Sequence, residues 1–154
     1  VHAIDESAAL WIGNDQIAGG DQGYLLYALA EEMGERFSIG KTGQAKANTV
    51  MLKLLNEARD ELSAPNACSD TSSTFTRLHG IVNSMMSQMI IPLVQGLIHN
   101  IQMNDKDRVE LYAQAFVPLV AGCSPETFDF LNENLFRANY IVVASDAIIK
   151  RIRS

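Results

Sequence analysis

The residue types that could bind a metal ion or transfer protons are histidines and acids, and their spacing in this chain forms no site. His79 and His99 have no acid within four positions on either side. The chain also has no Glu-x-x-His motif, which di-iron helical bundles use. On one helix the two histidines would be about 30 Å apart, too far to share an ion. We therefore expect no metal site and no cofactor.

Catalytic motifs are also missing, so the sequence favours a non-enzymatic protein. There is no Gly-x-Ser-x-Gly, no His-Glu-x-x-His and no P-loop. Gly19-Gly20-Asp21 precedes an expected helix and could bind an anion through backbone N–H groups. Without a preceding strand and a lysine, we interpret it as a loop with an Asp N-cap. Four acids lie opposite the apolar positions of their segments, which predicts a solvated acidic face: Glu31, Glu35, Glu57 and Glu61.

The segment from Leu78 to Asn104 contains no Asp, Glu, Lys or Arg and organises the rest of the chain. Its apolar residues cover most of the circumference of a helix, which is typical of a bundle core or a membrane span. A span needs about 20 predominantly apolar residues, and Asn, Ser and Gln interrupt every such window here. We therefore predict a soluble core helix, kinked at Pro92 because proline removes one backbone hydrogen bond, and no transmembrane segment.

One face of this helix is polar but almost free of charge. The polar stripe consists of Arg77, Ser84, Gln88, Gln95, His99 and Lys106. An exposed face normally carries Lys or Glu, whereas neutral hydrogen-bonding groups suit a contact between helices in which they set the register. We therefore predict an interaction module that forms a homo-oligomer or binds other protein subunits.

A repeated pattern around two prolines supports an alternative function. Gln88–Gly96 is echoed by Gln114–Gly122, and the turn residues Asn104-Asp105 lie midway between Pro92 and Pro118. In an antiparallel hairpin both prolines would lie at one level, where side chains or water could satisfy the freed carbonyls. The same level could also hold a small apolar ligand such as a pigment or lipid. The residues expected to line that pocket are Ser84, Ser87, Gln88, Gln95, Gln114 and His99.

Composition limits the fold and the partners. A chain of 154 residues with 47% hydrophobic residues can bury a core without metals or disulfides, so residues 1–154 are expected to form a single domain. The formal net charge of −6 argues against binding to nucleic acid, which requires a basic face. Cys68 and Cys123 lack metal-ligand spacing, and both a disulfide and unpaired buried thiols are compatible with the sequence.

Helical spacing recurs along the chain and predicts an all-α bundle of about seven helices around the long Pro-kinked central helix. Residues 2–12, 24–37 and 47–62 each carry an apolar stripe. For residues 24–37 the stripe consists of Leu25, Leu26, Leu29, Met33 and Phe37. Ser38–Gly43 is expected to be a loop, and Ser124-Pro125 a helix start. Tyr140–Val143 has strand-like composition but no strand to pair with, so a final helix through Arg151 is favoured.

The amino-terminal third resembles a known repeat. The run from Ala8 to Gly13, the run from Gly23 to Glu31, Phe37 and Asn48 carry this resemblance, which covers about residues 5–60. They are similar to an all-helical repeat domain in proteins of diatoms, brown algae and related stramenopiles, some of them secreted. In that repeat a cysteine pair flanks the phenylalanine, and this chain lacks that pair. The resemblance implies an extracellular or organellar location and no particular activity.

Overall fold

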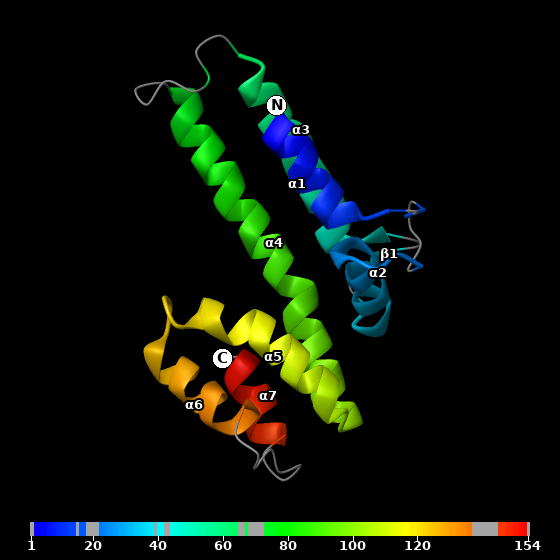
Figure 1. Ribbon diagram of the computed structural model, residues 1–154, viewed down its shortest axis with the longest axis vertical. Coiled ribbons are helices and arrows are strands. Elements are labelled where there is room, and N and C mark those ends of the chain that lie inside the picture. Colours follow the sequence, from blue (N-terminus) through cyan, green and yellow to red (C-terminus); the bar gives the residue numbers. More distant parts are fainter. Residues whose placement is uncertain are drawn as a thin grey trace. The chain divides into compact units, whose positions relative to one another are not determined.

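The computed structural model describes residues 2–14, 16–17, 22–38, 40–41, 44–64, 67, 73–136 and 145–153. Within these residues there are seven helices and one short hairpin (Figure 1). The helices are α1 (His2–Ile12), α2 (Leu26–Arg36), α3 (Lys46–Leu62), α4 (Ser73–Met103), α5 (Lys106–Val120), α6 (Pro125–Leu135) and α7 (Ser145–Arg153). The predicted all-α fold with a long central helix is confirmed. Cys68 and Tyr140–Val143 lie outside the described residues.

The chain divides into two compact units, Val1–Pro92 and Leu93–Ser154. Helix α4 crosses the boundary between them and contains Pro92. The expectation of a single domain over residues 1–154 stays a prediction, as does a kink at this proline. We describe each unit separately.

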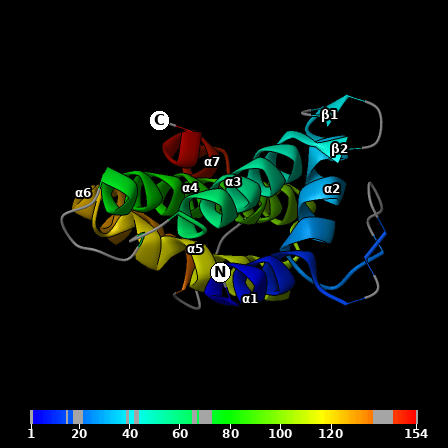
Figure 2. The same cartoon turned by 90° about the horizontal axis from the view of Figure 1, so that it is seen from above.

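The first unit consists of α1, α2, α3, the hairpin and the first part of α4. Strands β1 (Gly40–Lys41) and β2 (Gln44–Ala45) pair in antiparallel register beside α2 (Figure 2). The sequence predicted a loop here, because two-residue strands are too short to show alternation. The hairpin has a structural role, since it presents the backbone N–H of Ala45 to α2.

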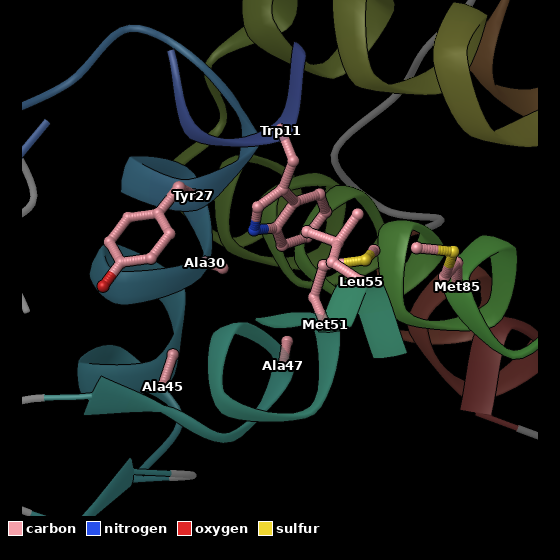
Figure 3. Close-up of a cluster of buried hydrophobic side chains, with 8 residues drawn as sticks. All are labelled: Trp11, Tyr27, Ala30, Ala45, Ala47, Met51, Leu55 and Met85. Atoms are coloured by element: carbon pink, nitrogen blue, oxygen red, sulfur yellow. The ribbon is translucent and has the colours of Figure 1, made fainter. Parts of the chain in front are cut away.

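Aromatic and small side chains form the core of the first unit, and they come from α1, α2, α3, α4 and the hairpin (Figure 3). The buried cluster contains Trp11, Tyr27, Ala30, Ala45, Ala47, Met51, Leu55 and Met85. On α2 the predicted stripe is wrong in part: Leu25 is exposed, Leu26 and Leu29 are half-buried, and only Met33 is fully buried. The face that packs inward carries small residues instead. At Gly34 an added Cβ would lie 2.7 Å from the Cβ of Ala45, so close packing of α2 on the hairpin requires glycine.

The second unit consists of the last part of α4 with α5, α6 and α7, and its core is mainly apolar. Its buried apolar side chains are Leu97, Ile98, Ile101, Val109, Ala113, Phe116, Val117, Leu131, Leu135, Ile148 and Ile149. Gln95 and Asn100 are also buried, and the Nδ2 of Asn100 donates to the carbonyl of Gly96 at 2.7 Å within α4. The predicted turn between α4 and α5 is confirmed, because Asn104 has a φ of 56° and Asp105 caps α5 by accepting from the backbone N–H of Arg108. The predicted start of α6 is also confirmed, since the Oγ of Ser124 accepts from the N–H of Thr127.

Candidate interaction surfaces

Helix α4 exposes a line of large apolar side chains in the first unit. Phe75, Val82, Met86 and Met89 retain 44%, 39%, 52% and 39% of their accessible surface. At 100° per residue these four positions fall within about 60° of one another, so they form one apolar stripe. We expected α4 to be buried over most of its circumference. This expectation is confirmed in the second unit, where Leu97, Ile98 and Ile101 are buried. It is wrong for the apolar stripe, whose side chains are exposed.

The predicted polar stripe lies on the opposite side of α4 from the apolar stripe. At its start, Arg77 forms an ion pair with Glu61 of α3, so this face meets the protein's own neighbouring helix. Gln95 is buried, whereas Gln88 and His99 are half-buried and Ser84 is exposed. Lys106 does not belong to this face, because α4 ends at Met103 and Lys106 is the first residue of α5. The polar stripe as an intermolecular interface stays a prediction.

Several of the predicted pocket residues bond within their own helix. The hydroxyl of Ser84 donates to the carbonyl of Gly80 at 2.9 Å, and that of Ser87 donates to Asn83 at 3.0 Å. Gln114 is exposed and donates to Glu110 one turn earlier on α5. Pro92 is fully buried and Pro118 is exposed. The predicted ligand pocket, with Gln88, Gln95 and His99 as further members, stays a prediction.

A groove runs between α3 and α4 within the first unit, and its volume is about 650 Å³. Its lining consists of Leu54, Glu57, Asp60, Glu61, Arg77, Gly80, Ile81 and Ser84. Leu54 and Ile81 form the apolar part, and three acids against one arginine make the rim acidic. The expectation that Glu57 and Glu61 lie on a solvated face is wrong for Glu61, whose side chain is 14% exposed and paired with Arg77.

A buried hydrogen-bond network joins α1, α2, the hairpin and α3. Asn48 is 0% exposed; its Nδ2 donates to the carbonyl of Tyr27 at 2.9 Å and to Oε1 of Glu31 at 2.6 Å. Its Oδ1 accepts from the indole N–H of Trp11 at 3.0 Å. The second oxygen of Glu31 accepts from the backbone N–H of Ala45 at 2.8 Å. The prediction that Glu31 lies on a solvated face is therefore wrong.

This network contains four of the residues that carried the resemblance to the stramenopile repeat, namely Trp11, Tyr27, Glu31 and Asn48. Their spacing in the sequence is explained by their meeting at one point of the fold. The resemblance itself stays a prediction. The polar side-chain groups of Trp11, Glu31 and Asn48 are all paired within the protein, so the network is suited to fixing three helices and a hairpin rather than to binding a ligand.

The remaining side chains that could bind a metal ion or react do not gather at one place within the described ranges. Within the described ranges, no three His, Cys, Asp or Glu side chains lie close enough to hold a metal ion. Cys123 is an exposed free thiol at the end of α5 and not a buried one. Among the helices of the described ranges, α4 is long and apolar enough to cross a bilayer by length and composition, and about a third of its most apolar window is buried in the protein.

Comparison with known proteins gives one distant similarity. No protein-family model and no solved structure matches the chain. The chain is similar to peroxisomal biogenesis factor 3 of Bos taurus, with 24% identity over 130 residues. The match covers 81% of this chain and 34% of the bovine protein, so the chain spans about a third of the length of this curated relative.

Proposed function

We propose that this protein is a non-enzymatic helical interaction module that associates with a second copy of itself through the apolar stripe of α4. The observation that carries the proposal is the exposure of Val82, Met86 and Met89 along one side of the helix. Contiguous exposed apolar surface is costly in water and marks interaction sites. From Phe75 to Met89 the stripe is about 21 Å long, long enough for one helix to pack along it.

The charge distribution supports a second copy as the partner. Each molecule has a formal net charge of −6, but Leu78–Asn104 contains no Asp, Glu, Lys or Arg. Two copies that meet along this segment bring no like charges together, whereas most other surfaces of an acidic protein would repel. A partner of other composition would gain nothing electrostatic from this stripe.

The similarity to a peroxisomal biogenesis factor supports an organellar location over an extracellular one. We propose that the module acts in the assembly of an organelle such as the peroxisome. Fractionation of the source cells, with antibodies raised to the purified chain, tests this location. Sedimentation with peroxisomes supports it, and recovery in the culture medium contradicts it.

Replacing Met86 by glutamate tests the stripe, because a buried carboxylate without a partner strongly disfavours association. Light scattering coupled to size-exclusion chromatography should detect wild-type dimers, and M86E should weaken dimerisation at least about thirtyfold, equivalent to about 2 kcal/mol. The matched control is L111E, since Leu111 on α5 is 62% exposed and lies outside the stripe. A monomeric wild type at high concentration, or equal dimerisation of M86E and wild type, would contradict the proposal.

A further inference from the structure

The exposed side of α7 carries charges opposite in sign to those of α3 and at the same spacing. On α3 the order is Lys53, Glu57 and Asp60, at positions i, i+4 and i+7. On α7 the same positions are Asp146, Lys150 and Arg153. Residues at this spacing lie along one side of a helix. Two such helices laid parallel would therefore align three pairs of opposite charges.

The charges on both sides are accessible. Lys53, Asp60, Asp146, Lys150 and Arg153 are exposed, and Glu57 is half-buried. Within the described ranges no ion pair reaches Asp60, Lys150 or Arg153. Lys53 and Glu57 are held at 3.5 Å in an exposed intrahelical pair, which water weakens and a new partner can replace.

The hollows on the two surfaces are lined mainly by charges of opposite sign. The groove between α3 and α4 has Leu54 and Ile81 beside its acidic rim. On α7 a shallow hollow of about 500 Å³ is lined by Asp146, Ile149, Lys150 and Arg153. Ile149 is 8% exposed and belongs to the core of the second unit, so α7 presents Lys150 and Arg153 to the acidic rim of the groove and no large apolar side chain.

We propose that α7 of one molecule docks in the α3–α4 groove of a second copy, with Lys150 against Glu57 and Arg153 against Asp60. The inference rests on the proposed self-association and adds a second surface to it. The two surfaces of this contact differ, so the contact is head-to-tail and extends dimers into rings or longer assemblies. It depends on charge, whereas contact through the apolar stripe of α4 does not.

The two proposed contacts differ in how they depend on salt concentration. In 50 mM salt the wild type forms assemblies larger than a dimer, and in 500 mM salt these dissociate to the dimer because exposed charges are screened. Light scattering and analytical ultracentrifugation measure both masses. A wild type that stays monomeric or dimeric in low salt overturns the inference.

Charge-reversal variants test which charged residues of the groove and of α7 form the contact. Both E57K/D60K and K150E/R153E are expected to weaken the larger assemblies roughly tenfold or more, because single exposed pairs contribute little and two are reversed together. The combination of all four reversals restores the assembly with its polarity exchanged. Equal assembly by either double variant and by wild type, or failure of the combination to restore it, overturns the inference.

Two controls distinguish this contact from the proposed function. K46E/R108E changes the net charge as much as K150E/R153E, at exposed positions in the first turns of α3 and α5, and should assemble like wild type. M86E should lose the dimer but retain the salt-sensitive contact. If the groove binds a basic helix of another protein instead, K150E/R153E has no effect on self-assembly, and the inference fails while the α4 dimer stands.

Discussion

The cores of the two units of this protein are stabilised by different kinds of contact. The first unit has a polar centre in which Asn48, Glu31 and Trp11 bond across α1, α2, α3 and the hairpin. The second unit has a mainly apolar centre. Its capping and buried side-chain hydrogen bonds are local, as at the caps Ser124 and Asp105 and at the buried Asn100, which bonds to Gly96 within α4. A hydrogen-bond network defines one geometry because any displacement leaves buried groups unpaired, whereas apolar contacts tolerate adjustment.

The same difference affects which residues a unit can bury. In the first unit the small residues Ala45 and Ala47 are buried in the same cluster as Tyr27 and Ala30 of α2, while Leu26 and Leu29 are half-buried. In the second unit, ordinary large aliphatic residues fill the core. A protein that interacts through a defined surface benefits from a rigid support, and the network lies in the unit that carries the apolar stripe and the groove.

The largest effect is expected for Asn48→Ala in the first unit. The change removes three buried hydrogen bonds, one of them to the carboxylate of Glu31, and should lower the free energy of unfolding by about 4 kcal/mol. Trp11 is the single tryptophan and is buried in this unit, so its fluorescence follows the unit directly. The urea midpoint by fluorescence should fall by about 2 M.

The matched control for that variant is Asn56→Ala, because Asn56 is an exposed asparagine of the same helix. It should leave the fluorescence midpoint within error of wild type. Equal midpoints for the Asn48 variant and this control would mean that the network contributes no net stability, and the contrast between the two cores would disappear.

A smaller effect is expected for Leu131→Ala in the second unit. Leu131 is 0% exposed on α6, which packs against α5 and α7, and the cavity left by the lost methyl groups should cost about 3 kcal/mol. Far-UV circular dichroism should show an earlier transition, while the fluorescence midpoint of Trp11 moves less. Leu111→Ala, at an exposed leucine of α5, serves as the comparison and should change neither signal.

Coincident shifts of the circular dichroism and fluorescence midpoints for the Leu131 variant would show that the two cores are coupled. They would mean that the two cores unfold as one cooperative system through α4, which belongs to both units. The two cores would then differ in composition but would not unfold independently of each other.

Local signals in the sequence predicted the elements that depend on local chemistry. Ser124-Pro125 began a helix because a hydroxyl cap and a proline act within one turn, and Asn104 ended one because it tolerates a positive φ. The existence and order of the helices followed from spacing alone. The pairing of Gly40–Lys41 with Gln44–Ala45 was missed, since strands of two residues show no alternation and their support from Glu31 of α2 is distant in the sequence.

Features that depend on contacts between distant parts of the chain could not be predicted from the sequence. Glu31 looked like a solvated acid because its partners, Asn48 and Ala45, are 17 and 14 residues away. The apolar stripe of α4 could have been found from the spacing of Val82, Met86 and Met89, but apolar spacing does not say whether another helix covers it. The groove between α3 and α4 is lined by residues of two helices, so no single segment encodes it.

The smallest effect is expected for Ser124→Ala, which tests how much a helix cap contributes to the stability of the second unit. The Oγ of Ser124 accepts from the N–H of Thr127 and donates to its hydroxyl at 2.8 Å, so its loss should cost about 1 kcal/mol and lower the urea midpoint by circular dichroism by about 0.5 M. Ser87→Ala is the control, because that hydroxyl donates only within its own helix, and it should leave the midpoint unchanged. A loss for Ser124→Ala as large as that for Asn48→Ala would place a decisive hydrogen bond in the second unit as well and refute the division into a polar and an apolar core.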